Sequence, residues 1–188
     1  MKRYILTGTP GAGKTSILRA LAERGTQTVE EAATAVIAQE QARGEDEPWT
    51  APSFIDRIAT LQHRRQLQAD ADAAADADGG GGGAAVQVYD RSPICTHALS
   101  RYLGYPVSAV LRAEIERVTL QRIYQRRVFF VRNLGFCEPT AARRISFADS
   151  LEFERVHEES YRAFGYELVD IPAGELAERT AAVRALLT

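Results

Sequence analysis

Residues 8–16 read Gly8-Thr9-Pro10-Gly11-Ala12-Gly13-Lys14-Thr15-Ser16 and follow closely on the apolar run Tyr4-Ile5-Leu6. The spacing is a glycine, four residues and then Gly-Lys-Thr, which is the pattern of a phosphate-binding loop between a buried strand and a helix. In such a loop the backbone N–H groups and the N-terminus of the following helix bind an anion together. A chance match in a glycine-containing loop is the alternative, and the order strand, loop, helix argues against it. We therefore predict that residues 8–16 bind the phosphates of a nucleotide.

Two side chains of this stretch have specific expected roles. Lys14 is predicted to reach the β- and γ-phosphate oxygens, and the Thr15 hydroxyl to bind the magnesium ion that bridges them. Lys2 and Lys14 are the only lysines of the chain, and its other basic residues are arginines apart from three histidines. This bias, together with the abundant alanine, indicates a GC-rich genome, as many bacterial chains have. The expected cofactors are ATP and Mg²⁺.

The length and charge of the chain limit the classes of protein to which it can belong. Its 188 residues suit a single domain, 1–188. The formal charge of −2 and the pI near 6.0 argue against non-specific nucleic-acid binding. No apolar run is long enough for a membrane span or a signal peptide. These features predict a cytoplasmic protein, whose oligomeric state the sequence leaves open.

The cysteines and histidines show no metal-ligand spacing. Cys95 and Cys137 lack a CxxC pattern and are expected to be reduced, partly buried thiols. The three histidines, His63, His97 and His157, lie far apart in the sequence, so surface or packed side chains are a better interpretation than a zinc site.

Strand-like and helical segments alternate along the chain. Strands are expected at 4–6, 26–29, 84–90, 127–131 and 167–171, and helices at 16–24, 32–42, from 53 onward, 96–103, 108–121, 146–164 and 175–187. Repeated strand–helix units form a parallel sheet with helices on both faces. We therefore predict an α/β fold with a five-stranded parallel sheet.

Two internal segments are open to more than one interpretation. The helix from Ser53 carries Phe54, Ile58, Leu61 and Gln62 on one face, and these side chains either line a substrate pocket or simply pack in the core, as does Trp49. Residues 68–85 are rich in alanine and aspartate and contain five consecutive glycines at 79–83, so we predict a flexible low-complexity loop at about 69–84. An acidic arm for a basic partner is the weaker alternative.

Charged residues follow three of the predicted strands. Glu30 and Glu31 come after the second strand, Asp90 and Arg91 after the third, and Arg143 and Arg144 lie in the loop after the fourth. Ligands of parallel sheets bind outside the carboxyl ends of the strands, so one cleft can hold all of these residues with the phosphate-binding loop. In a phosphate-loop protein, Asp90 has the position of the second carboxylate that organises the metal, which makes Thr15 and Asp90 the predicted metal ligands.

With these elements placed, the chain resembles the P-loop family that groups small AAA-type ATPase-like proteins with the nicotinamide-riboside kinase half of the bacterial NAD regulator. The resemblance extends along nearly the whole chain. The matching stretches are TGTPGAGKTSIL, VEEAA, FIDRIATLQHRRQ, VYDRSPICTHALSRYLG, RRVFFVRNLGF and ARRISFADSLEFERVHEESYRAFGYELVDIP. The first is shared by many NTPases, whereas DRSP and the last block are more specific. The resemblance implies the P-loop NTPase fold of nucleoside and nucleotide kinases.

The same resemblance implies roles for single residues. Glu31, or its neighbour Glu30, is similar to the carboxylate that acts as base or substrate anchor in nucleoside kinases. Asp90 is then the carboxylate on the metal side, and Arg91 a contact to phosphate or substrate. Arg143 and Arg144 fall in the lid of the family.

Two functions from different classes agree with these features. The first is an ATP-dependent kinase that transfers the γ-phosphate to a small hydroxylated, nucleoside-like metabolite. The second is a nucleotide-dependent ATPase or GTPase switch or binding module without a small-molecule acceptor. Phosphoinositide binding is a third possibility, and it rests only on animal members of the family that are described as binding GTP and phosphoinositides.

Overall fold

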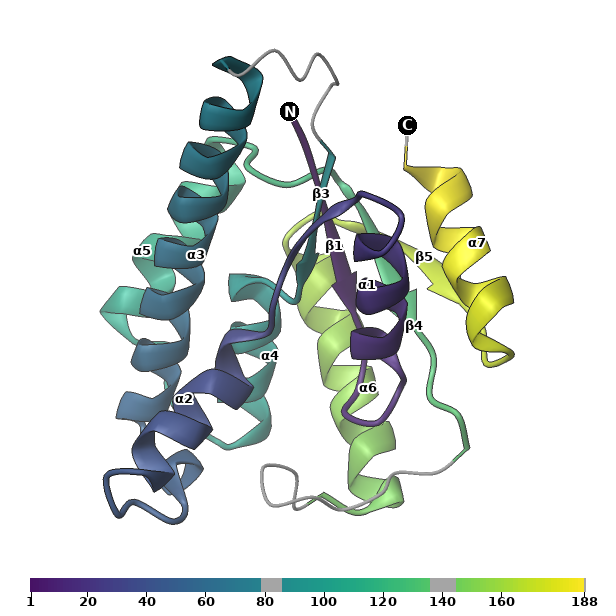
Figure 1. Cartoon of the computed structure of the whole chain (residues 1–188). Helices are drawn as coiled ribbons and strands as arrows, with labels where there is room; N and C mark the ends of the chain where they lie inside the picture. Colours follow the sequence, from purple (N-terminus) through teal and green to yellow (C-terminus); the bar gives the residue numbers. More distant parts are fainter. Residues whose placement is uncertain (79–85, 136–144, 188) are drawn as a thin grey trace.

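Five parallel strands form one sheet in a computed structural model that describes residues 1–78, 86–135 and 145–187 (Figure 1). The spatial order is β2-β3-β1-β4-β5, and every neighbouring pair is parallel. The strands are β1 (Lys2–Thr7), β2 (Gln27–Val29), β3 (Val86–Asp90), β4 (Arg127–Val131) and β5 (Glu167–Ile171). This arrangement confirms the predicted five-stranded parallel sheet.

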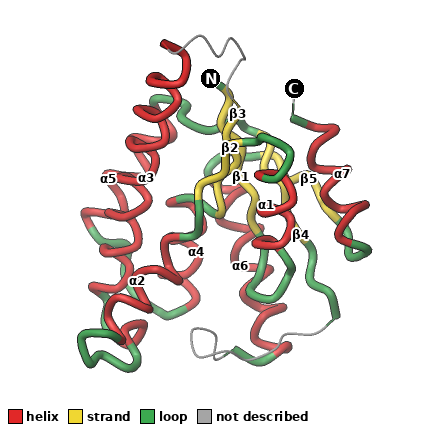
Figure 2. The backbone as a smooth tube through the Cα atoms, in the orientation of Figure 1, coloured by secondary structure: helices red, strands yellow, loops and turns green. Residues whose placement is uncertain are grey.

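Seven α-helices and one 3-10 turn connect and follow these strands in the described residues (Figure 2). They are α1 (Lys14–Ala22), α2 (Ala32–Gln41), the turn η1 (Pro48–Thr50), α3 (Ser53–Asp78), α4 (Pro93–Tyr102), α5 (Ala109–Leu120), α6 (Phe147–Ala163) and α7 (Leu176–Leu186). No helix among these residues combines the length and the apolar character that crossing a bilayer requires.

The central strand β1 explains how the helices divide between the two faces of the sheet. Successive side chains of a strand point to opposite faces. Tyr4 and Leu6 pack with apolar side chains of α1 and α7, whereas Ile5 packs with side chains of α2 to α6 on the other face. All three side chains are buried, because helices cover both faces of β1, and this explains why the strand is an uninterrupted apolar run. The predicted helical layers on both faces are confirmed.

Gly8 marks the point where the chain leaves β1 and enters the phosphate-binding loop. Its φ angle is 133°, and a Cβ atom at this position would lie 2.2 Å from the carbonyl oxygen of Val131 in β4. A contact that short is not possible for any side chain, so the loop can approach the end of β4 only with glycine at position 8. The backbone of the loop is therefore set by the neighbouring strand as well as by its own sequence.

The predicted flexible loop at about 69–84 is wrong for its first half. Helix α3 continues to Asp78, and Ala69 and Ala73 are buried, one helical turn apart. Asp70 accepts hydrogen bonds from Arg3 of β1, at 2.9 Å from Nε and 2.7 Å from Nη2. The buried side chain of Gln87 donates to the Ala69 carbonyl at 2.8 Å. Alanine is the best helix former, and the burial of Ala69 and Ala73 together with the contacts of Asp70 and Gln87 decides this composition in favour of a helix instead of a loop. Residues 79–84 of the predicted loop lie outside the described residues.

The contribution of the contact between Asp70 and Arg3 to the free energy of unfolding can be measured. Asp70→Asn should lower the free energy of unfolding by about 1–2 kcal/mol, because the partly buried guanidinium of Arg3 loses a two-point charged hydrogen bond. Urea unfolding at pH 7 measures the change, and Asp76→Asn on the exposed side of the same helix is the matched control. Equal stabilities of the two variants would show that residues 69–78 do not dock on β1.

Candidate active site

A cavity of about 460 Å³ lies at the carboxyl ends of β1 and β3. One wall consists of loop and α1 residues, namely Pro10, Gly11, Gly13, Lys14, Thr15 and Ser16. The opposite walls come from α2, α3, α4 and α6, and Asp90 and Arg91 lie in the same cavity. Gly8, Thr9 and Ala12, which were also predicted to contact the nucleotide, are not among the residues that line the cavity, and their role stays a prediction.

Lys14 is the first residue of α1 and points back over its own loop. Its Nζ donates a hydrogen bond to the Thr9 carbonyl oxygen at 2.8 Å, and the side chain is buried. Burial, and after it the charge of Arg91, lowers the lysine pKa to about 8. The ammonium group is therefore a desolvated cation that lines the cavity beside the loop, and its contact with phosphate stays a prediction.

Asp90 ends β3 and is also buried. Its Oδ1 atom has no hydrogen-bond partner among the described residues. Burial raises the pKa of this carboxyl group to about 6, and the negative charge of Glu31 adds to the increase although Lys14 opposes it. The unpaired buried carboxylate oxygen of Asp90 and the hydroxyl group of Thr15, which lines the same cavity, are oxygen ligands of the kind that Mg²⁺ prefers. These two residues would hold the ion, and the ion would neutralise charge on bound phosphates.

Arg91 connects several groups at the centre of the cavity. Its φ angle is 72°, and its backbone N–H donates to the Leu6 carbonyl oxygen of β1 at 3.0 Å, which holds the turn after β3 in this rare conformation. The side chain forms an ion pair with Glu31 through Nε. Its Nη1 donates to the sulfur of Cys95 at 3.0 Å and to Nε2 of His157 at 3.2 Å. The guanidinium group is therefore fixed before any ligand binds.

Glu31 is the member of the Glu30–Glu31 pair that lies in the cavity, and Glu30 is exposed. The Glu31 carboxylate also accepts a hydrogen bond from the Thr34 hydroxyl at 2.6 Å. Burial alone would raise its pKa, but the charges of Arg91 and Lys14 overcome burial and lower the pKa to about 2. Glu31 is consequently an anion at every pH at which the protein is expected to work.

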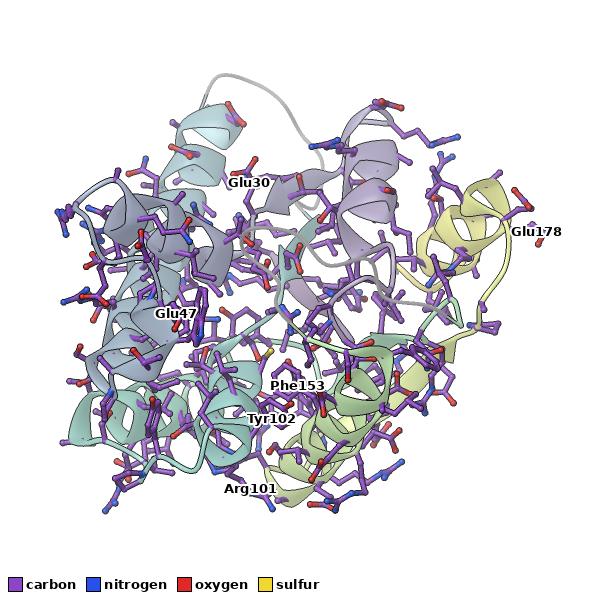
Figure 3. All side chains as sticks on the ribbon, turned by 90° about the horizontal axis from the view of Figure 1, so that it is seen from below. Glu30, Glu47, Arg101, Tyr102, Phe153 and Glu178 are labelled. Carbon is purple, nitrogen blue, oxygen red and sulfur yellow. The ribbon has the colours of Figure 1, made fainter. Side chains whose placement is uncertain are left out.

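The side of the cavity away from the loop is lined mainly by apolar and aromatic side chains. They include Trp49, Phe54, Ile58, Leu99, Tyr102 and Phe153. The rings of Tyr102 and Phe153 lie 4.7 Å apart between centroids, and both residues line the cavity (Figure 3). Gln62 of α3 adds an amide, whose Oε1 accepts a hydrogen bond from Thr96 at 2.8 Å.

These contacts settle the two interpretations of the helix from Ser53. Phe54 and Ile58 are buried core residues and also line the cavity, whereas Leu61 packs against the core outside it. The cavity is therefore lined both by polar residues of the loop and by apolar and aromatic side chains, the mixture that small-molecule sites have.

A family model described as an AAA domain matches residues 3–179. The chain belongs to this AAA-domain family. The match agrees with the AAA-type part of the resemblance, and the likeness to nicotinamide-riboside kinase stays a prediction. A comparison with curated proteins found no match.

Solved structures show which fold this AAA-domain chain has. A deoxyadenosine kinase from M. mycoides with bound dCTP is 14% identical, with a TM-score of 0.62, and the comparison covers 100% of this chain and 98% of that one. The same kinase with bound dATP is 14% identical, with a TM-score of 0.51 and coverage of 99% and 100%. At this level of identity the likeness concerns the fold, and it confirms the predicted P-loop fold of nucleoside-kinase type.

Three buried site residues of the AAA-domain chain were not predicted from its sequence. Cys95, His157 and Tyr161 surround the connection from β3 to α4. The imidazole Nδ1 of His157 donates to the Phe153 carbonyl at 2.9 Å, so Nε2 is the acceptor for Arg91 and for the thiol of Cys95 at 2.8 Å. Burial, together with the charge of Arg91, lowers the pKa of this histidine to about 3.

Tyr161 lies one turn further along α6 and shares a hydrogen bond of 2.9 Å with the Ser92 hydroxyl. The spacing of Phe153, His157 and Tyr161 at every fourth position could have signalled that the histidine faces the core. His157 is indeed a packed side chain, as one of the two sequence interpretations held.

The predicted lid arginines, Arg143 and Arg144, and the second cysteine, Cys137, lie outside the described residues. Ile145, the first described residue after this gap, lines the cavity. The lid role of the arginine pair stays a prediction.

The raised pKa of Asp90 predicts how one substitution changes stability. The folded chain binds this proton more tightly than the unfolded chain, whose carboxyl pKa is near 3.8. The stabilisation by the proton is therefore present below about pH 4 and is lost as the pH rises through about 6. Asp90→Asn should raise the free energy of unfolding at pH 7.5 by about 1–3 kcal/mol, and by much less at pH 4.5. Urea unfolding at both values tests this, and a variant less stable than the parent at pH 7.5 would contradict it.

Proposed function

We propose that this protein is an ATP-dependent kinase whose acceptor is a small, hydroxylated, nucleoside-like metabolite. One observation carries the proposal: the cavity that the phosphate-binding loop lines is also lined by apolar and aromatic side chains and by Glu31 and Arg91, which form an ion pair. A carboxylate and an arginine in the same cavity as ring-binding side chains suit an acceptor with a hydroxyl group, which ATP hydrolysis alone does not require. The fold shared with proteins described as deoxyadenosine kinases supports the same assignment.

The residues have complementary roles in this proposal. Lys14 and the loop N–H groups bind the β- and γ-phosphates, and Thr15 and Asp90 would hold Mg²⁺, which would lower the charge repulsion between donor and acceptor. The aromatic end of the cavity binds the ring of the acceptor and directs its hydroxyl group to Glu31. Arg91 stabilises negative charge on the transferring phosphoryl group.

In the transfer step, the acceptor oxygen forms a bond to the γ-phosphorus while the bond from that phosphorus to the β–γ bridging oxygen breaks. The acceptor proton passes to the Glu31 carboxylate, and ADP leaves. A carboxylate with a pKa near 2 is a weak base, but it accepts a hydrogen bond well. In a loose transition state the acceptor is only slightly bonded to phosphorus, so orientation of its hydroxyl group matters more than early removal of the proton.

A screen for phosphorylated products tests the proposal. The protein is incubated with Mg-ATP and a pool of nucleosides and other metabolites, products are identified by mass spectrometry, and ATP hydrolysis without acceptor is measured in parallel. We expect one or a few ring-containing acceptors to gain the mass of a phosphoryl group and to accelerate ATP use. ATP consumption that no acceptor accelerates would overturn the kinase assignment and favour the nucleotide switch.

A further inference from the structure

An arginine of the last helix lies against the outside of the phosphate-binding loop. Arg179 is on the first turn of α7 and is only 5% exposed. Helix α7 packs beside α1, and its Val183 shares a core with Leu18 and Leu21 of that helix (Figure 1). The packing of α7 therefore holds the arginine side chain beside the loop.

The guanidinium group of Arg179 contacts the loop backbone directly. Nη2 donates to the carbonyl oxygen of Ala12 at 2.8 Å and to that of Arg132 at 3.1 Å. A Cβ atom on Gly13 would lie 2.9 Å from Nη1, so the loop and the guanidinium are in close contact. The arginine therefore touches the peptide unit between Ala12 and Gly13 on the side away from the cavity.

The charge of Arg179 has no acidic partner in the described part of the chain. No ion pair joins it to a carboxylate there, and its Nε is buried without a hydrogen-bond partner. The neighbouring Glu178 is exposed and points outward (Figure 3). Burial lowers the pKa of the arginine, as expected for a cation that has lost water without gaining an anion. An unpaired buried cation destabilises a fold, so its presence here calls for an anion nearby.

The peptide between Ala12 and Gly13 can transmit the effect of Arg179 to an anion in the cavity. In a trans peptide the C=O and N–H groups point in opposite directions. The Ala12 carbonyl points to Arg179, and Gly13, which carries the N–H group of the same peptide, lines the cavity. A charged donor on the carbonyl polarises the peptide and makes its N–H group a stronger donor.

We propose that Arg179 is a positioning residue of the phosphate site, which orients and polarises the peptide between Ala12 and Gly13 toward a bound triphosphate. Its ligand class is a chain of phosphates, either in a nucleoside triphosphate or as inorganic tripolyphosphate. The inference rests on the proposed nucleotide site. It does not depend on which acceptor is phosphorylated.

Calorimetric titration with four ligands tests this role, namely Mg-ATP, Mg-ADP, AMP and Mg-tripolyphosphate. Arg179→Met should weaken binding of ATP and tripolyphosphate about tenfold and of ADP less, and should leave AMP unchanged, because the effect follows the phosphate charge. Arg179→Lys keeps the charge and should stay within about threefold of the parent. Arg184→Met, on the exposed side of the same helix, is the matched control and should change nothing.

Arg179→Gln removes the charge but keeps a polar side chain that matches arginine as far as the Nε position, so it provides the same test if the methionine variant does not fold. Parental affinity for ATP in either neutral variant, or an equal loss for ATP and AMP, would reduce Arg179 to a packing residue and overturn the inference. A parent protein that binds neither Mg-ATP nor tripolyphosphate would instead overturn the nucleotide site itself.

Discussion

Lys14→Met should weaken Mg-ATP binding by about 2–4 kcal/mol, which is roughly 30- to 1000-fold, because two charged hydrogen bonds to phosphate are lost. The same substitution should not destabilise the protein in the absence of nucleotide. Burial lowers the pKa of this lysine to about 8, so its charge opposes folding at pH 7, and methionine occupies a similar volume without that charge. Calorimetric titration measures the affinity, and thermal unfolding without ligand measures the stability.

Lys2→Met is the matched control for this experiment. Lys2 is the only other lysine of the chain, and it is exposed at the opposite end of β1 from the loop. The control removes the same formal charge and should leave ATP affinity unchanged. If Lys14→Met binds Mg-ATP as tightly as the parent, residues 8–16 are not the nucleotide site.

Glu31→Gln should lower kcat for phosphoryl transfer roughly 10²-fold, the lower end of the range that general-base assistance supplies, because a carboxylate with a pKa near 2 is a weak base and acts mainly by orienting the acceptor hydroxyl group. Glutamine keeps the shape of the side chain and a hydrogen-bond acceptor, but it cannot take the proton of the acceptor hydroxyl group. Since Glu31 is assigned to the acceptor and not to ATP, the dissociation constant of Mg-ATP should stay within about threefold of the parent. Steady-state kinetics with the identified acceptor and titration with Mg-ATP separate the two effects.

Glu30→Gln is the control for the adjacent carboxylate, which is exposed. It should retain near-parental kcat. A larger loss in Glu30→Gln than in Glu31→Gln would assign the proton acceptor to the other member of the pair. A loss of ATP affinity in Glu31→Gln that equals its loss of kcat would place Glu31 at the phosphates instead of the acceptor.

Glu31 is held in place by a series of contacts that runs through Arg91 to His157. The ion pair with Arg91 holds the carboxylate in place, and the same arginine is fixed by His157 and Cys95. A neutral histidine is required for this arrangement, because its unprotonated Nε2 is the acceptor. Its pKa near 3 ensures that the imidazole stays neutral at physiological pH.

Much of this fold could be predicted from the sequence because the deciding signals are local. The strand, loop and helix around residues 8–16 are consecutive, and the parallel sheet follows from the alternation of strands and helices. The same local logic placed Asp90, Arg91 and Glu31 at the carboxyl ends of strands, where the structure brings them into one cavity with the loop.

The features that needed the tertiary structure join residues that are distant in the chain. Asp70 and Arg3 are 67 positions apart, Arg91 and His157 are 66 apart, and Arg179 contacts a loop residue 167 positions away. Local composition describes residues 69–78 equally well as a loop or as a helix, and only the docking on β1 decides between them. Likewise, the hydrogen bonds of His157 and of Arg179 depend on the groups that tertiary packing places beside these side chains. The sequence by itself determined the phosphate-binding loop and the five strands of a parallel sheet, because backbone geometry and hydrophobic periodicity are encoded over a few residues, whereas the spatial order of the strands came from the structure. Only the tertiary structure decided which charges are paired and which are not, because pairing depends on contacts between distant segments.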